Sequence, residues 1–314
     1  MFFPLWVMKM LTLALSNEMV RNLINKPERL RGPLPPGRYY VEPKYDGERE
    51  LILRDGDVLL MANRYATVYE PEMLPNLFDH MKDALPNGLF DAELVVLPKG
   101  TVYDLMKAVR NGRDDNLCLM IFDVLRLDGE DVRGLPLSER KHLLEKVVKE
   151  NDMVKLVPYE LVATHEQVER AFRDFVSRGF EGIVVKTDGT YHAPWFKMKK
   201  AYTVDLVVLG FRRTKEWEKN GVPASFLVGY YDGSKFVPLC HVASGLSWAE
   251  KKAIGEFFRK KRLITGQDRK NVYVKPILVL EIEYQELSEN GKLRHPRIKR
   301  IRWDKAPTEC LKPS

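Results

Sequence analysis

Residues 42–49 read Glu-Pro-Lys-Tyr-Asp-Gly-Glu-Arg and follow an extended run over residues 37–41. The pair Asp46-Gly47 predicts a tight turn just after Lys44, because both residue types are favoured where the chain reverses direction. A lysine at the edge of such a turn can act as a nucleophile if its amine is neutral. The alternative is an ordinary surface Lys–Asp pair beside a turn. These eight residues alone leave both interpretations open.

The chain has 314 residues and a formal charge of +7, with 45% hydrophobic and 30% charged residues. This length is sufficient for two domains, each with its own core. The positive charge favours an anionic partner, most often a nucleic acid. Cys118, Cys240 and Cys310 are far apart and form no C-x-x-C pair. We therefore expect a reduced, intracellular protein without a disulfide framework or a structural zinc site.

The N-terminal segment Met1–Leu15 is mostly apolar. It lacks the basic start of a secretory signal, and Pro4 and Lys9 interrupt it. It is also too short to span a bilayer. We therefore expect a cytoplasmic protein that is not inserted into a membrane.

Residues 89–97 alternate between polar and apolar side chains, which predicts a strand. Asp91 and Glu93 fall on one face of this strand. The other face is formed by Phe90, Ala92, Leu94 and Val96. Two carboxylates on an otherwise apolar strand indicate either a solvated face or a contact with magnesium or a ribose.

Two largely apolar segments, 117–125 and 179–186, predict buried strands. Phe122 in the first segment is either a core residue or a platform for a ligand. Glu181 lies where the second segment begins, and a buried carboxylate is costly unless it is paired or binds a cation. In residues 195–199, Trp-Phe-Lys-Met-Lys, alternation places both lysines on one face. They would repel unless an anion lies between them, and a solvated edge strand is the alternative.

A second domain is expected from Thr203, which divides the chain into residues 1–202 and 203–314. The second part is rich in short strands, with one helix opened by the capping box Ser247-x-x-Glu250. This pattern predicts a small Greek-key barrel of the OB type. The barrel would end in a strand within residues 294–305 that is rich in Arg and Lys.

Taken in order, these segments resemble the ATP-dependent DNA ligases, a family of covalent nucleotidyltransferases. The resemblance covers about residues 41–307, and residues 44–49 are similar to the nucleophile motif K-x-D-G-x-R of that family. The later motifs of the family are resembled by Asn63-Arg64, Phe90–Val95, Phe122–Leu125, Glu181–Lys186, Trp195–Lys199 and Arg302–Lys305.

The resemblance implies an α+β fold. It consists of an adenylation (nucleotidyltransferase) domain, built of ATP-grasp-like antiparallel sheets with helices, followed by an OB-fold β-barrel. Lys44 would attack ATP and carry AMP, and Lys197 and Lys199 would act as catalytic cations at the α-phosphate. We expect burial and nearby cations to lower the pKa of Lys44, so that its amine is neutral. The residues implied in binding ATP are Glu42, Arg49, Arg64, Glu93, Phe122, Lys197, Lys199, Arg302 and Lys305.

The same resemblance implies that Glu93 and Glu181 bind Mg²⁺ or Mn²⁺. The implied substrate is nicked double-stranded DNA, sealed by a monomeric enzyme. Two departures from the family pattern are Ala92, where glycine is usual, and a short segment over residues 188–194. Because Lys44 lies near the start of this sequence, we expect no N-terminal DNA-clamping domain before it.

Three other classes remain as alternatives: an mRNA capping guanylyltransferase, an RNA ligase and a non-enzymatic nucleic-acid-binding OB protein. Capping enzymes typically carry D-G-L-I-F where this chain has residues 181–186, and RNA ligases usually lack an OB domain with R-x-D-K. Within residues 251–258, the spacing Lys-x-x-Ile-x-x-Phe-Phe resembles a sliding-clamp-binding box. The same spacing packs a helix on a barrel, and we favour this second interpretation.

Overall fold

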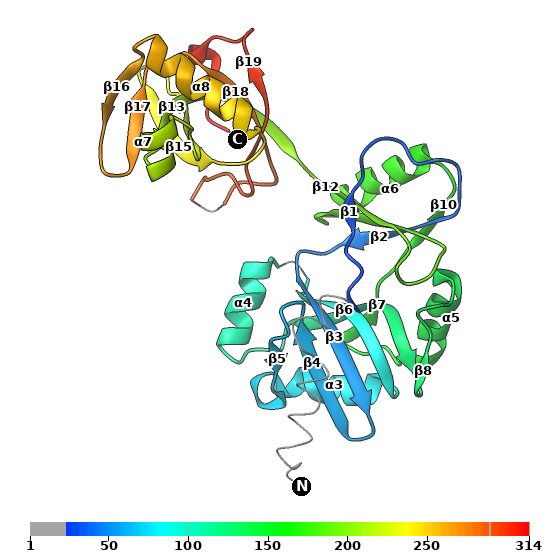
Figure 1. Ribbon diagram of the computed structural model, residues 1–314. Coiled ribbons are helices and arrows are strands. Elements are labelled where there is room, and N and C mark those ends of the chain that lie inside the picture. The colour runs from blue at the N-terminus through cyan, green and yellow to red at the C-terminus, as the bar shows by residue number, and fades with distance from the viewer. Residues whose placement is uncertain (1–22, 99, 289, 314) are drawn as a thin grey trace. The chain divides into compact units, whose positions relative to one another are not determined.

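The computed structural model describes residues 23–98, 100–288 and 290–313. The apolar segment Met1–Leu15 considered above lies outside these residues. The chain divides into two compact units, the first ending at Lys199 and the second beginning at Lys200. Figure 1 shows both units. Within the described residues, no helix is long and apolar enough to cross a membrane.

The first unit contains a five-stranded sheet that is mainly antiparallel (Figure 1). Its strands, in spatial order, are β1 (Glu28–Arg29), β12 (Trp195–Lys199), β11 (Gly182–Thr187), β2 (Tyr39–Lys44) and β10 (Glu160–Val162). Helix α6 (His165–Ser177) begins at a capping box formed by Thr164 and Gln167. Its apolar residues Val168, Ala171 and Phe175 pack on Val41, Ile183 and Val185 of the sheet. The helix therefore covers one face and leaves the other face to the site.

A second sheet lies in the same unit and has seven strands. Six of them follow one another in the sheet, and the seventh, β9 (Val154–Leu156), pairs in parallel with β7 (Leu117–Leu127). In spatial order the six are β5 (Val68–Tyr69), β4 (Val58–Asn63), β3 (Glu48–Asp55), β6 (Gly88–Val96), β7 (Leu117–Leu127) and β8 (Glu130–Asp131). The helices of this region are η1 (Pro71–Met73), α3 (Pro75–Ala84), α4 (Val102–Arg110) and α5 (Leu137–Val147).

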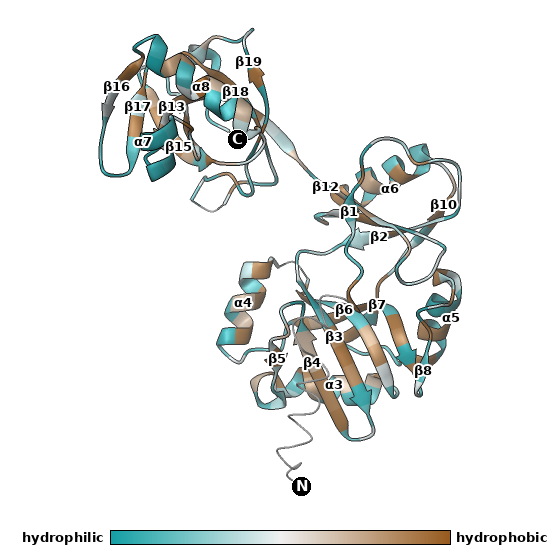
Figure 2. Cartoon of the chain, viewed as in Figure 1, coloured by the Kyte–Doolittle hydropathy of each residue, from teal (hydrophilic) through white to brown (hydrophobic). Residues whose placement is uncertain are grey.

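The alternation predicted for residues 89–97 is confirmed. Four apolar residues of β6 lie in the main core of the first unit, which also contains residues of α3, α4 and α5: Phe90, Ala92, Leu94 and Val96. Asp91 and Glu93 lie on the opposite face. On that face a smaller cluster joins the two sheets through Val95, Met120, Phe122, Tyr191 and Trp195. Figure 2 shows the strands of the second sheet coloured mostly as hydrophobic. The predicted site residues Asp91, Glu93 and Phe122 therefore lie on the face where the two sheets meet.

Glu50 is an exception in this sheet, because it is fully buried and neither carboxylate oxygen has a hydrogen-bond partner among the described residues. Burial raises the pKa of Glu50 well above its ordinary value, and the nearby Glu48 and Glu93 add to the rise. The folded state therefore keeps a proton that the unfolded chain loses near its ordinary pKa of about 4.3. Stability contributed by the neutral group is present below that pH and is lost as pH rises through the raised pKa.

Replacement of Glu50 by glutamine should remove this pH dependence, because the amide cannot ionise. We expect Glu50→Gln to be about 1–3 kcal/mol more stable than the wild type at pH 8, with a smaller difference at pH 5. Urea unfolding of both proteins at the two pH values measures this. Glu130→Gln, at an exposed position on β8, is the control. An identical change between pH 5 and pH 8 in wild type and Glu50→Gln would contradict the prediction.

The second unit is a strand-rich barrel with one long helix, as the OB prediction required. Its strands are β13 (Tyr202–Arg212), β14 (Phe226–Tyr231), β15 (Phe236–Val242), β16 (Ile264–Gln267), β17 (Asn271–Val274), β18 (Val279–Tyr284) and β19 (Arg297–Arg302). Its helices are α7 (Lys215–Asn220), α8 (Trp248–Lys260) and η2 (Pro307–Glu309). Strand β13 pairs with β14, β17 and β18, and a bulge between Val208 and Gly210 lets it change neighbours. The strands β16 and β17 were not predicted from the sequence.

Helix α8 begins at the predicted capping box of Ser247 and Glu250. Ile254 and Phe258 are buried in the barrel core, and the Lys251 amine donates to two backbone carbonyls. Two of the apolar positions in the clamp-like spacing are therefore occupied in packing the helix on the barrel. This arrangement agrees with the interpretation favoured above.

Candidate active site

Lys44 lies at the end of β2, in a cross-strand row with Gly182 of β11 and Lys199 of β12. A Cβ atom at Gly182 would lie 2.0 Å from the Met198 carbonyl oxygen, so a larger residue would force the strands apart. Glu181, directly before Gly182, lies between the two lysines. Its Oε2 is 2.6 Å from Nζ of Lys44, and its Oε1 accepts a hydrogen bond from Lys199.

The charge state of Lys44 differs from the expectation. Burial alone would lower the pKa of Lys44, but the carboxylates of Glu181 and Glu93, together with Asp46, raise it above the usual lysine value. The prediction of a lowered pKa was therefore wrong for the protein without ATP. The sequence placed cations near Lys44 but did not reveal that Glu181 lies between them. The amine must lose a proton before it can attack an electrophile.

Acylation of lysines tests this charge state without any need for activity. Only the neutral amine reacts, so we expect the acylation rate of Lys44 to rise about tenfold per pH unit from pH 7 to pH 9 without levelling off. The variant Glu181→Gln should react faster at Lys44 at each pH, because it removes the nearest carboxylate. Mass spectrometry of the Lys44 peptide gives the rate.

Lys197 is the matched control for that measurement, since burial, Lys199 and Lys44 lower its pKa. Its acylation should approach a plateau at lower pH than that of Lys44. A plateau for Lys44 at or below the pH found for Lys197 would contradict the prediction.

Lys197 lies two cross-strand rows away from Lys199, opposite Val184, which is itself opposite Glu42. Period-two alternation therefore places Lys44, Lys197 and Lys199 on one face of the sheet, as predicted for the two lysines of β12. Three cations on one face create a positive potential that favours an anion.

Arg49 and Glu93 are direct cross-strand partners on β3 and β6. The guanidinium of Arg49 donates to Asp91 through Nε to Oδ1 at 2.8 Å and Nη2 to Oδ2 at 2.5 Å. The hydroxyl of Tyr191 donates to Asp91 Oδ2 at 2.5 Å and accepts from Arg49 at 3.2 Å. Asp91 and Tyr191 therefore fix the orientation of Arg49. The sequence pattern placed Asp91 and Glu93 on the same strand face but did not show that Asp91 binds Arg49.

Glu181 and Glu93 are the two carboxylates that raise the pKa of Lys44 most strongly. Burial raises the pKa of Glu93 to about 7; Lys44 and Arg49 oppose the rise, while Asp91 and Glu181 add to it. In the part of the chain that the structure describes, no group of three or more His, Cys, Asp or Glu residues could hold a metal ion. Mg²⁺ commonly binds one or two protein carboxylates and completes its shell with phosphate and water oxygens. The two glutamates beside Lys44 fit that requirement.

Phe122 of β7 packs edge-to-face on Trp195, with ring centroids 6.0 Å apart. Two cations lie over its ring: Nζ of Lys186 at 4.5 Å and Cζ of Arg49 at 5.2 Å from the centroid. Cation–π contacts of this kind stabilise buried charges. Phe122 therefore packs against charged groups as well as against apolar side chains.

Glu42 is buried and lies between two lysines, with Oε2 2.7 Å from Nζ of Lys186 and Oε1 2.5 Å from Nζ of Lys141. Burial lowers the pKa of Lys186 to about 8, although Glu42 opposes the change. A buried carboxylate is stable only with such partners. Glu42, Lys186 and Phe122 therefore form one connected cluster of side chains, with Glu42 two residues before Lys44 on β2.

Arg64 is exposed, with its guanidinium 4.8 Å from the centroid of the Tyr65 ring. Asn63 is buried, and its amide donates to Glu48 at 3.0 Å. The Asn63 side-chain oxygen accepts from the backbone N–H groups of Tyr65 and Thr67, both at 3.0 Å. Asn63 therefore shapes the turn that presents Arg64.

Arg302 and Lys305 lie in the second unit, at the end of β19 and in the turn that follows. Both contact Asp205 of β13, a residue that the sequence analysis did not identify. The other predicted site residues lie in the first unit.

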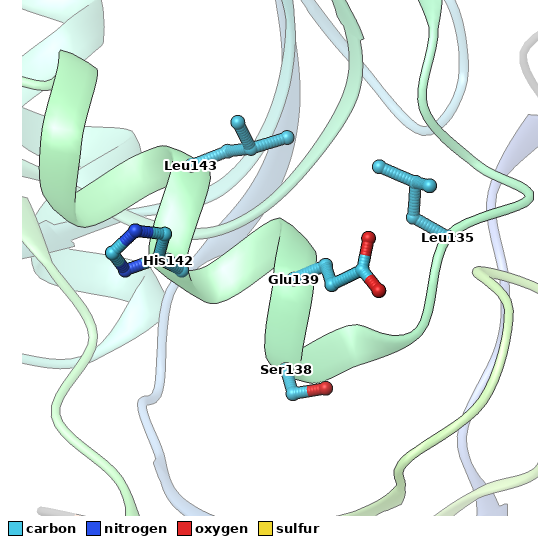
Figure 3. A pocket seen from close by; sticks show the side chains of 5 residues that line it. All are labelled: Leu135, Ser138, Glu139, His142 and Leu143. Atoms are coloured by element: carbon cyan, nitrogen blue, oxygen red, sulfur yellow. The ribbon is translucent and has the colours of Figure 1, made fainter.

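One cavity of about 340 Å³ lies elsewhere in the first unit. Figure 3 shows the side chains that line it, which come from α5 and the segment before it: Leu135, Ser138, Glu139, His142 and Leu143. None of them is a predicted site residue. Arg140 and Lys141 of the same helix are buried instead, on the side that faces the site.

Comparison with known families gives two matches along the chain. Residues 18–201 match the model of the ATP dependent DNA ligase domain, and residues 219–305 match that of the ATP dependent DNA ligase C terminal region. The chain belongs to the ATP-dependent DNA ligase family. Both the adenylation domain and the OB-fold domain expected from the sequence are thereby confirmed.

Curated ligases of similar sequence come from archaea and bacteria. The DNA ligase of Sulfolobus acidocaldarius is 28% identical over 331 residues, which cover 88% of this chain and 54% of that protein. The DNA ligase of Thermococcus onnurineus is 30% identical over 302 residues, covering 86% and 52% respectively. The chain thus spans about half the length of the curated relatives it matches.

Solved structures support the ligase fold. A structure named Pmar-Lig_Pre is 21% identical with a TM-score of 0.64, covering 86% of this chain and 64% of the other. A structure from an analysis of Lig E DNA ligases is 17% identical with a TM-score of 0.58, covering 89% and 100%. At these identities the likeness concerns the fold alone.

Three residues of this ligase-family chain that contact the predicted site residues were not predicted, because their partners are distant in sequence. They are Lys141, Tyr191 and Lys186. Lys141 lies on a helix whose apolar stripe gives no sign of a buried charge. Tyr191 lies in the short segment between β11 and β12. Lys186 ends one of the segments that carried the resemblance, and its position at the end of an apolar strand was the one available signal.

Proposed function

We propose that this chain is an ATP-dependent DNA ligase that seals 5′-phosphate/3′-hydroxyl nicks in duplex DNA through lysyl-AMP and adenylated DNA. The arrangement of Lys44 carries the proposal: its amine lies 2.6 Å from Glu181, in one cross-strand row with Lys199. The connected cluster of Phe122, Lys186 and Glu42 includes the residue two positions before Lys44 on the same strand. A nucleophile, cations for a phosphate and an aromatic surface are the groups that transfer of AMP requires.

In the first step, the Lys44 amine loses its ammonium proton and attacks the α-phosphorus of ATP. A nitrogen–phosphorus bond forms, and the bond from the α-phosphorus to the α–β bridging oxygen breaks. Pyrophosphate leaves with that electron pair, and the nitrogen loses a second proton. Lys197 and Lys199 stabilise the charge on the α-phosphate as it develops.

The remaining side chains would bind the nucleotide. Phe122 would offer its ring face to adenine and Glu42 would contact the base edge. Arg49 and Glu93 would contact the ribose. Arg64 is proposed to contact the nucleotide from its exposed turn. Arg302 and Lys305 of the second unit would contact the pyrophosphate that leaves.

Glu93 and Glu181 would hold Mg²⁺ or Mn²⁺, which supplies positive charge to the phosphates when it is bound. Glu181 would then exchange its contact with the Lys44 ammonium for one with the metal. That exchange removes the strongest influence that raises the pKa of Lys44. The raised pKa of the protein without ATP is therefore compatible with a neutral amine in the reacting complex.

In the second step, an oxygen of the DNA 5′-phosphate attacks the phosphorus of lysyl-AMP and the nitrogen–phosphorus bond breaks; the Lys44 nitrogen keeps the electron pair and takes up a proton, so that it leaves as an amine. In the third step, the 3′-hydroxyl attacks the DNA phosphate, a phosphodiester forms and AMP leaves.

The distribution of charge supports DNA binding by the OB unit. Residues 200–314 contain 23 Lys and Arg against 13 Asp and Glu, a charge of +10, whereas residues 1–199 contain 28 against 31, a charge of −3. A basic surface of this kind binds the phosphate backbone.

The test is incubation of the protein with α-labelled ATP, followed by denaturation. We expect an acid-labile label on the protein that is released as AMP when nicked DNA is added. Label from GTP instead would indicate a capping enzyme. Transfer to nicked RNA but not to nicked DNA would indicate an RNA ligase, and the absence of any label would overturn the proposal.

The domain boundary between residues 202 and 203, the monomeric state and the cytoplasmic location stay predictions.

A further inference from the structure

Asp205 of β13 contacts both cations that the first step assigns to the leaving pyrophosphate. Its Oδ2 lies 3.0 Å from Nη1 of Arg302 and 2.7 Å from Nζ of Lys305. Its Oδ1 accepts a further hydrogen bond from Nη1 of Arg302 at 3.2 Å. One carboxylate therefore holds an ammonium and a guanidinium against the same oxygen atom.

The barrel brings these three residues together from separate parts of the chain. Strand β18 lies between β13 and β19, with Asp205 opposite Glu281 and Val279 opposite Arg302. Arg302 therefore reaches across β18 to Asp205, and Lys305 returns to it from the turn after β19. The side chain of Asp205 is only 13% exposed, so these contacts are not fully screened by solvent.

The other edge of the Arg302 guanidinium is held by Asp304, with Nε at 2.9 Å and Nη2 at 2.8 Å from its carboxylate oxygens. Two carboxylates thus fix the plane of the guanidinium. Without Asp205, Arg302 and Lys305 would repel each other, because like charges at this separation disfavour one another.

We infer that Asp205 is a positioning residue for the first step, which keeps Arg302 and Lys305 together as one preformed cationic pair for the pyrophosphate group. The inference rests on the proposed function. Pyrophosphate gains charge on the former bridging oxygen when the bond to the α-phosphorus breaks. Two cations held at a fixed separation stabilise that charge without reorganising at the moment of reaction. In the second and third steps no pyrophosphate is present, so Asp205 should not affect them.

Glu281 provides a matched control on the neighbouring strand. It holds two other cations of β19, with Lys299 at 2.9 Å and Arg300 at 2.5 Å. Glu281→Gln therefore removes the same kind of contact from the same sheet, but from cations to which the first step assigns no part.

The experiment measures single-turnover formation of lysyl-AMP from α-labelled ATP, its reversal by pyrophosphate, and sealing of a pre-adenylated nick without ATP. We expect Asp205→Asn to slow the first two reactions about 10- to 100-fold, because misplaced groups lose most of their effect. Sealing of the pre-adenylated nick should stay within about twofold of wild type. Asp205→Glu, which keeps the charge, should restore part of the rate, and Glu281→Gln should form lysyl-AMP at the wild-type rate.

A second comparison separates positioning from a general loss of structure. If Asp205 acts through the two cations, Asp205→Asn should cause no further slowing in a protein that already carries Arg302→Ala and Lys305→Ala. The inference is overturned if Asp205→Asn forms lysyl-AMP at the wild-type rate. It is also overturned if all three reactions slow equally, or if Glu281→Gln has the same effect. Failure of the wild type itself to form lysyl-AMP would instead overturn the proposed function.

Discussion

Replacement of Lys44 by arginine should reduce formation of lysyl-AMP from ATP by at least about 10⁴-fold, a loss of the size found when an enzyme loses its nucleophile. Arginine keeps the positive charge beside Glu181, so the ion pair and the fold are preserved. Its guanidinium stays protonated at any accessible pH and cannot attack phosphorus. Retention of α-labelled AMP on the denatured protein measures the loss.

Sealing of a nick that already carries 5′-linked AMP is the internal control for Lys44→Arg. That reaction begins after the lysine has completed its covalent role, so it should proceed at a rate within about tenfold of wild type. Lys197→Arg provides a second control, because it changes a neighbouring cation without removing the nucleophile. Retained covalent label in Lys44→Arg would assign the nucleophile to another residue.

Replacement of Arg140 by methionine should lower the free energy of unfolding of the first unit by about 3–5 kcal/mol, because it leaves a buried carboxylate without its cation. Arg140 and Asp123 are both fully buried and are joined by hydrogen bonds of 2.7 and 3.0 Å. The guanidinium also donates to the carbonyl oxygens of Leu135 and Gly189. Urea unfolding monitored by tryptophan fluorescence measures the change.

The double variant Arg140→Met with Asp123→Leu tests the cause. Replacing both charges by apolar groups removes the unpaired carboxylate, so much of the lost stability should return. Arg173→Met breaks an exposed pair with Glu169 and should change stability by less than about 1 kcal/mol. A double variant less stable than Arg140→Met would show that the pair is not the cause.

Local patterns predicted the parts of this fold that depend on neighbouring residues. The alternation of β6 placed Asp91 and Glu93 on the site face because side-chain direction in a strand has a period of two. The Ser247 capping box marked the start of α8 correctly. Strand β16 was missed because its sequence, Ile-Thr-Gly-Gln, is short and polar, and pairing with β17 rather than burial maintains it.

In the site, too, residues within a motif could be predicted, whereas contacts between residues far apart in the sequence could not. The motif segments identified Lys44, Glu181 and Lys199, but the pKa of Lys44 depends on the distance between groups more than 130 residues apart. Lys141, Tyr191 and Asp205 each act through a partner supplied by another element. No spacing along the chain encodes such contacts, so Asp205 could not be distinguished from the other aspartates by its sequence position.

The row formed by Lys44, Gly182 and Lys199 has a consequence for insertions and deletions. Strand pairing alone aligns these three positions, and a shift of one residue in β11 or β12 would turn every side chain of that strand to the opposite face. Lys199 would then point toward α6, away from Lys44. Changes of length can therefore occur between β11 and β12 only where Tyr191 still reaches Asp91. Changes of length that preserve this alignment are therefore confined to a few residues of the segment between β11 and β12.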